Sequence, residues 1–436
     1  MTLLHPNCLI TLVLCEQIMR TVINQATTDV GRQIIVNHRR HYVATLVLGV
    51  FFAVFALSAA QAGASGPYRI KSDIAYGPAS GRPATSRLDV YVPNEKAAEP
   101  RPVVVWIHGG GWFKGDKANS TMPGKAKAFV DAGFVVVSAN YRLSPDLKGP
   151  EYLSRNRVRF PAAHLDVAQA VGWVNRHIER FGGDPGRILL GGESAGAQIA
   201  ALLATRSGFL QAQGVSAGQI KGVISIDAVG FNVPRMMTSK YRRRNAGFQR
   251  MMFNAFGTPA EEKRKPRWSA ASPVRYADPT DPPIYFVESA KAYDRQLDAF
   301  RMAVKLEQRL LVVWRVVPLS HRDGIGALLG NAGNDRGVTR RVIRFATEAV
   351  NPVVPQIVAR GKRVVRANGA PTATVRLELD VKPRVRQLFC TMDKHLTELC
   401  PPSWKLAPGL HDVHVEAFGN TGRLVGEKTF KVEVKK

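Results

Sequence analysis

Cysteine is scarce in this chain, with four residues among 436. So few cysteines exclude a protein built on a disulfide scaffold, and their spacing does not fit a zinc ribbon. Glycine and proline, at 38 and 27 residues, are not enriched, which excludes collagen-like and low-complexity classes. With 45% hydrophobic residues the composition is that of a globular protein, and the length predicts two folded domains.

Acidic side chains are also few, at 34 Asp and Glu against 61 Lys and Arg, which leaves a net charge of +27. This excess favours attraction to an anionic surface or polymer. The charge is spread along the chain and no nucleic-acid-binding module is present, so we expect no specific nucleic-acid partner. We predict neither a cofactor nor a metal site. His411 and His414 stand three apart in a predicted strand, where they would face opposite sides.

Charged side chains are absent between Arg40 and Arg69. Within this gap residues 43–59 are apolar, basic residues precede them, and small residues follow up to Ala62. The pattern predicts a signal peptide, so that residues 1–62 are an N-terminal extension and leader of an exported, periplasmic or secreted protein. The alternative is a membrane anchor formed by residues 43–59, because about 17 apolar residues are the lower limit for a span. Membrane contact is expected only through this segment, if it stays uncleaved.

Apolar and helix-like segments alternate through residues 66–351, which is typical of a doubly wound, mostly parallel sheet. We expect strands at 87–92 (an edge strand), 102–108, 134–138, 187–191, 220–226, 284–287 and 311–317, and helices at 163–181, 195–205, 292–310 and 338–350. Residues 231–281 interrupt this alternation and are rich in basic, aromatic and Met residues. They predict a cap insertion over the active site, or alternatively a basic loop with no role there.

Residues 356–436 change character and consist of short alternating segments separated by turn residues. This pattern predicts a small all-β sandwich as a second domain. Cys390 and Cys400 lie ten residues apart in this part of the chain. Because the protein is expected to be exported, we predict that these two cysteines form a disulfide.

The segment Gly192-Glu193-Ser194-Ala195-Gly196 follows a predicted strand and precedes an alanine-rich predicted helix. A G-x-S-x-G sequence in this context forms a sharp turn that exposes the serine hydroxyl at the end of a sheet. The turn lies at a helix N-terminus, where free N–H groups stabilise negative charge. Ser194 is therefore the candidate nucleophile.

A second glycine-rich segment ends another apolar strand, where Gly109, Gly110 and Gly111 follow His108. Three glycines allow backbone N–H groups to approach a reacting carbonyl without obstruction by side chains. We predict that this turn forms an oxyanion hole together with the N–H of Ala195.

The general base is predicted to be His321, which lies in a loop directly after the last strand. The other histidines fall in the leader, on a long helix, in the glycine turn or in the second domain. The acid should follow the strand at 284–287, where Glu288 and Asp294 are both candidates. Glu288 lies at the end of the strand and is slightly favoured, while Asp294 could be an ordinary carboxylate in the first turn of a helix.

Several segments together resemble one known group. His108–Trp112 (HGGGW), Asn140–Pro145 (NYRLSP), Phe160–Ala163 with Asp166, Phe181–Pro185 (FGGDP) and the G-x-S-x-G segment are similar to those of α/β-hydrolase esterases related to hormone-sensitive lipase. Feruloyl-esterase-like and kynurenine-formamidase-like members share the resemblance, which covers about residues 70–350. It implies the α/β-hydrolase fold, a Ser194 nucleophile, a His321 base and an acid near Glu288. The C-terminal part is similar to bacterial immunoglobulin-like modules.

These residues predict a serine hydrolase that cleaves carboxylic esters through an acyl-enzyme, with a small-molecule ester as substrate. One alternative is an aryl formamidase, which the kynurenine-formamidase-like resemblance suggests. Another is an exported binding protein that keeps a hydrolase fold without using it, which the uncertain position of the acid leaves open.

Overall fold

The computed structural model describes residues 66–436 apart from 78–84, 239–244, 291–292, 309–312, 322–323, 332, 394–397 and 402. The predicted leader at 1–62, with its alternative of an anchor at 43–59, lies outside the described residues. Within the described ranges, no helix is long and apolar enough to cross a membrane.

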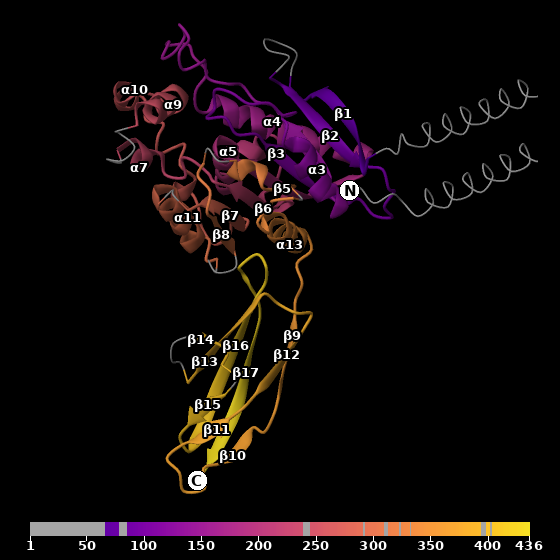
Figure 1. Cartoon of the computed structure of the whole chain (residues 1–436), viewed down its shortest axis with the longest axis vertical. Helices are drawn as coiled ribbons and strands as arrows, with labels where there is room; N and C mark the ends of the chain where they lie inside the picture. The colour runs from indigo at the N-terminus through magenta and orange to yellow at the C-terminus, as the bar shows by residue number, and fades with distance from the viewer. Residues whose placement is uncertain are drawn as a thin grey trace, which may run out of the picture. The chain divides into compact units, whose positions relative to one another are not determined.

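An eight-stranded sheet of order β1-β2-β4-β3-β5-β6-β7-β8 forms the centre of the N-terminal part (Figure 1). The strands are β1 (Tyr68–Ala75), β2 (Arg87–Pro93), β3 (Arg101–Ile107), β4 (Val135–Ala139), β5 (Gly183–Glu193), β6 (Ile220–Ile226), β7 (Ile284–Ser289) and β8 (Trp314–Val317). Neighbours from β4 to β8 run parallel, while β2 is antiparallel to both β1 and β4. The prediction that residues 87–92 form an edge strand is wrong, because β1 pairs with β2 and covers that edge.

Helices pack on this sheet because its central strands are apolar on both faces, as buried parallel strands are. The main helices are α3 (Met122–Asp131), α4 (Ala162–His177), α5 (Ala195–Thr205), α11 (Tyr293–Lys305) and α13 (Val338–Val350), with short turns at α6 (Gly208–Gln211), η1 (Ile178–Phe181), η2 (Ala217–Gln219) and η4 (Ile325–Ala327). Every residue of α5 is buried, and this helix packs against β5 and β6. Its many alanines allow that close approach and thereby bring its N-terminus to the end of β5.

The predicted insertion at 231–281 contains α7 (Val233–Thr238), α9 (Ala246–Phe256), α10 (Pro259–Arg264) and η3 (Pro273–Arg275). Glu261 on α10 joins these helices to the loop before α4. Its carboxylate accepts hydrogen bonds from Arg157 at 2.6 and 3.0 Å, from Arg159 at 2.7 Å and from the Thr258 N–H at 2.8 Å. The Arg157 side chain is fully buried. Burial alone would raise the pKa of Glu261, but these donors outweigh it and lower the pKa to about 2.

We expect Glu261→Gln to lower the free energy of unfolding by about 2–3 kcal/mol at pH 7, because Arg157 would remain buried without a counter-charge. The pKa of this carboxyl is lowered on folding, so its contribution is complete above pH 4.5 and is lost as the pH falls toward 2. Urea unfolding of both proteins at several pH values measures the difference. A difference that stays constant between pH 7 and pH 3 would contradict this account.

The C-terminal part forms its own hydrophobic cluster within residues 357–434. Its largest sheet has five strands in the order β10 (Val364–Arg366), β17 (Leu424–Lys435), β16 (Gly409–Phe418), β13 (Gln387–Met392) and β14 (Glu398–Leu399). Two separate two-stranded sheets complete this part of the chain. One pairs β9 (Gln356–Arg360) with β12 (Glu378–Lys382), and the other pairs β11 (Ala373–Val375) with β15 (Trp404–Leu406). The predicted disulfide between Cys390 and Cys400 is confirmed, with an S–S distance of 2.08 Å.

Candidate active site

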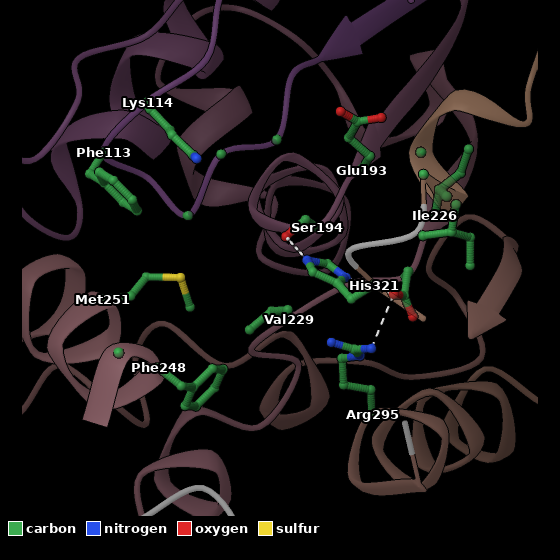
Figure 2. Close-up of a pocket in the computed structure, with 18 of the residues that line it drawn as sticks. Phe113, Lys114, Glu193, Ser194, Ile226, Val229, Phe248, Met251, Arg295 and His321 are labelled. Atoms are coloured by element: carbon green, nitrogen blue, oxygen red, sulfur yellow. Dashed lines mark hydrogen bonds and ion pairs between the residues drawn. The ribbon is translucent and has the colours of Figure 1, made fainter. Parts of the chain in front are cut away.

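The predicted functional residues gather at one edge of the large sheet. Parallel neighbours end at the same edge, so the loops after β3, β5, β6 and β8 meet there. This edge brings together the glycine turn after β3, Ser194 after β5, and His321 in the loop after β8 (Figure 2).

Ser194 occupies a strained turn between β5 and α5. Its backbone has φ 53° and ψ −112°, a combination that a non-glycine residue rarely adopts. The turn is held by a hydrogen bond of 2.8 Å from the Ser194 N–H to the carbonyl of Ile226. A Cβ at Gly196 would collide with the Ile107 carbonyl, so only glycine allows α5 to begin this close to β3. The hydroxyl is therefore presented at the sheet edge, as the sequence predicts.

His321 links the serine to a carboxylate. Its Nε2 lies 3.0 Å from Ser194 Oγ, and its Nδ1 lies 2.6 Å from Asp227 Oδ2. In the tautomer that satisfies both bonds, Nδ1–H donates to Asp227 and Nε2 accepts the serine proton. The structure thus places the predicted Ser194 and His321 in hydrogen-bond contact.

The acid in contact with His321 is Asp227, so the prediction of Glu288 or Asp294 is wrong on the geometry. Asp227 directly follows β6, and its Oδ1 accepts a hydrogen bond of 3.0 Å from the Ser289 N–H. Arg295 lies 3.1 Å from its Oδ2. Burial alone would raise the pKa of Asp227, but the hydrogen bond from His321 and the charge of Arg295 outweigh it and lower the pKa.

Neither predicted carboxylate is suited to that role. Glu288 is fully buried at the end of β7, and its carboxyl oxygens make no hydrogen bond to the imidazole. Burial and then the neighbouring charge of Asp227 raise the pKa of Glu288 well above its usual value, which favours the neutral form of this carboxyl. Asp294 instead pairs with Arg235 at 3.2 Å. Because neither of these carboxyls is hydrogen-bonded to His321, Asp227 is the counter-charge of the imidazole.

A signal for Asp227 was present in the sequence, since this residue directly follows the predicted strand at 220–226. The strands β6 and β7 are neighbours, with Ile226 opposite Val287. A carboxylate after either strand can therefore reach the loop that carries His321. Considering acids after both strands would have included the correct residue.

The predicted oxyanion turn lines the same cavity as Ser194. Gly110 has φ 110°, and a Cβ there would collide with the carbonyl of Lys114, so the turn requires glycine. His108 fixes the start of the turn, because its ring stacks on Tyr141 at 4.3 Å and its carbonyl accepts a bond of 3.0 Å from the Tyr141 hydroxyl. Ala195 begins α5 beside Ser194. Amide donors of the turn and of this helix N-terminus are thus available to a developing oxyanion.

The cavity around Ser194 has a volume of about 630 Å³. Its apolar lining comes from the glycine turn's loop, from the loops after β4 and β6 and from α9 of the insertion, and consists mainly of Phe113, Leu147, Val229, Phe248 and Met251. Figure 2 shows Phe113, Met251, Phe248 and Val229 on one side of Ser194. The insertion predicted to be a cap therefore contributes side chains to the wall of the cavity.

A buried lysine lies behind the nucleophile turn. Lys125 on α3 is fully buried, with its ammonium 3.6 Å from Glu193 Oε2 and 2.5 Å from Thr121 Oγ1. Burial lowers the pKa of Lys125, and the charge of Glu193 opposes that shift. Glu193, which precedes Ser194, thus faces a cation. Sequence reasoning did not identify this pair, because nothing in the spacing of the two residues indicates contact.

Metal-ligating side chains do not cluster in the part of the chain that the structure describes. Across those ranges there is no group of three or more His, Cys, Asp or Glu residues that could hold a metal ion. His411 bonds to Asp393 at 2.6 Å and His414 to Thr429 at 3.0 Å.

The strand order, the strained serine turn and the Ser194–His321–Asp227 contacts define an α/β-hydrolase. Solved structures share this fold, including a truncated carbohydrate esterase from gut microbiota with a TM-score of 0.51, 18% identity and coverage of 66% of this chain and 98% of that one. Residues 88–296, just under half of the chain, match the family model BD-FAE.

Curated relatives are also similar to this chain. Esterase LipQ of Mycobacterium tuberculosis is 37% identical over 134 residues, which are 30% of this chain and 28% of that protein. Isoprenylcysteine alpha-carbonyl methylesterase ICME of Arabidopsis thaliana is 30% identical over 220 residues, 49% of this chain and 47% of its own length. The chain spans less than half the length of these relatives.

Proposed function

We propose that this protein hydrolyses carboxylic esters through a covalent acyl-serine intermediate. The observation that carries the proposal is the continuous contact from Ser194 through His321 to the ionised Asp227, at 3.0 and 2.6 Å, beside the glycine turn. The names of the relatives, an esterase and a methylesterase, support the same reaction class.

In the first step Ser194 Oγ attacks the ester carbonyl carbon while His321 Nε2 accepts its proton. Asp227 stabilises the imidazolium that forms, and amides of the glycine turn and of Ala195 donate to the oxyanion. The imidazolium then gives its proton to the leaving alkoxide, and an alcohol departs. In the second step water attacks the acyl-serine, with His321 as its base, and the carboxylic acid is released.

The strained backbone at Ser194 contributes to this mechanism. Because the turn is held by the Ile226 carbonyl and by the close approach of Gly196 to β3, the hydroxyl stays in position before substrate arrives. Such preorganisation lowers the entropic part of the barrier.

The direct test is labelling by an alkyl fluorophosphonate, which reacts with activated serines. We expect the intact protein to gain the mass of one phosphonyl group, and peptide mapping to place it on Ser194. Hydrolysis of p-nitrophenyl acetate should disappear in proportion to labelling. A protein that is labelled nowhere and hydrolyses no ester would be a binding protein on a hydrolase fold.

A panel of p-nitrophenyl esters of increasing acyl length, assayed beside N-formylkynurenine, separates ester hydrolysis from the formamidase alternative. We expect kcat/KM to be higher for the esters. A clear preference for the formamide would replace ester hydrolysis with aryl formamide hydrolysis by the same residues.

A further inference from the structure

The charged side chains that line the cavity around Ser194 differ in whether an opposite charge lies beside them. Besides His321, the lining contains two acidic side chains, Asp227 and Glu193, and two basic ones, Arg295 and Lys114. Three of these four charges face an opposite charge within 4 Å, whereas no carboxylate of the described residues lies that close to the Lys114 ammonium.

Both acidic groups are compensated by cations. Asp227 accepts from His321 and lies 3.1 Å from Arg295, which is itself almost completely buried. Glu193 faces the buried ammonium of Lys125. With a neutral imidazole, the charges of these two pairs cancel, and among the described residues that line the cavity the charge left for a ligand is that of Lys114.

The position of Lys114 is set by the glycine turn. Its backbone N–H donates a bond of 3.1 Å to the Gly110 carbonyl, and its own carbonyl packs closely against Gly110. Its ammonium lies 5.6 Å from the centre of the Phe113 ring. Figure 2 shows the side chain directed toward Ser194 rather than away from the cavity. In the described part of the chain, the structure gives Lys114 no carboxylate partner.

We infer that this site takes ester substrates that carry a carboxylate group, and that Lys114 is the residue that selects them. The inference rests on the proposed ester hydrolysis and specifies its substrate class. The acidic groups of the cavity do not repel such a substrate because each is already paired. Lys114 is exposed, so its attraction is partly screened by water, and we expect a preference of modest size.

The test compares two matched pairs of esters, because the structure does not indicate whether the carboxylate belongs to the acid or to the alcohol. The first pair is p-nitrophenyl hydrogen adipate and p-nitrophenyl hexanoate. The second is p-acetoxybenzoate and its methyl ester. For each pair, the ratio of kcat/KM for the anionic and neutral members is measured in wild type and in Lys114→Met, so that intrinsic reactivity cancels.

We expect Lys114→Met to lower the anionic-to-neutral ratio about fivefold in one of the pairs, and Lys114→Arg to restore it. The wild-type ratio should also fall with added NaCl. Lys96→Met is the control, since it removes an exposed lysine that does not line this cavity.

Ratios that change less than twofold in both pairs would overturn the inference. An equal loss for anionic and neutral esters would also overturn it, because Lys114 would then assist the oxyanion instead of selecting the substrate. If wild type hydrolyses none of the four esters, the proposed function fails, and the inference falls with it.

Discussion

Replacing Ser194 by alanine is expected to lower kcat for p-nitrophenyl acetate by about a millionfold, which leaves only the residual rate provided by the binding site and its amide donors. Without Oγ, no acyl-enzyme can form, and the imidazole of His321 has no hydroxyl to deprotonate. The backbone at Ser194 is strained, but its turn is held by the Ile226 carbonyl and by Gly196, so the variant should fold. Initial rates at high enzyme concentration measure the loss.

The matched control is Ser225→Ala. Ser225 is fully buried on β6, and its hydroxyl makes no hydrogen bond in the structure. This variant removes the same atom from a neighbouring strand and should retain nearly full activity. If Ser194→Ala kept more than a hundredth of the wild-type rate after purification free of host esterases, another nucleophile would have to be found.

Replacing Asp227 by asparagine is expected to lower kcat by about ten-thousandfold, since an amide in place of the carboxylate favours the wrong imidazole tautomer. The asparagine amide would donate to Nδ1, so Nε2 would carry the proton and could no longer accept one from Ser194. The neutral side chain would also fail to stabilise the imidazolium. Fluorophosphonate labelling rates give a second measure of the same loss, because labelling depends on the activated serine.

Glu288→Gln and Asp294→Asn are the controls for this variant. Glu288 is buried and its raised pKa favours the neutral form, so a glutamine is close to an isosteric replacement, and we expect kcat within about tenfold of wild type. Asp294 pairs with Arg235 and not with the imidazole, so Asp294→Asn should lower kcat as little as Glu288→Gln does. An active Asp227→Asn protein beside an inactive Glu288→Gln protein would return the role to the residue that the sequence favoured.

The acid shows where prediction from sequence failed and why. The position after the strand at 284–287 is a reasonable expectation, but the chain offers Glu288 and Asp294 there and Asp227 after the preceding strand. The three carboxylates differ in what surrounds them in the fold, and their positions along the chain do not distinguish them. Asp227 receives donors from His321, Ser289 and Arg295, whereas Glu288 is enclosed without a donor at hydrogen-bond distance. Burial and partners decide which carboxyl is ionised, and both depend on side chains distant in sequence.

Other features followed from local sequence. The helix at 195–205 and the strand at 220–226 have the predicted bounds, because an alanine-rich segment and a β-branched segment each leave little choice of conformation. The serine turn and the glycine turn were also correctly placed, since each needs glycines at positions that short-range sterics dictate. The spacing of Cys390 and Cys400, together with the expected export of the protein, was enough to predict their disulfide.

By itself, the amino-acid sequence determined most of the strands and helices of the large sheet, the nucleophile on its strained turn, and the histidine that reaches it. Tertiary structure decided the acid, the pairing of Glu193 with the buried Lys125, and the cavity charge left at Lys114. The physical reason is the range of the interactions concerned. Backbone conformation responds to neighbours within a few residues, whereas the ionisation of a side chain responds to every charge and dipole that folding brings within several ångströms of it.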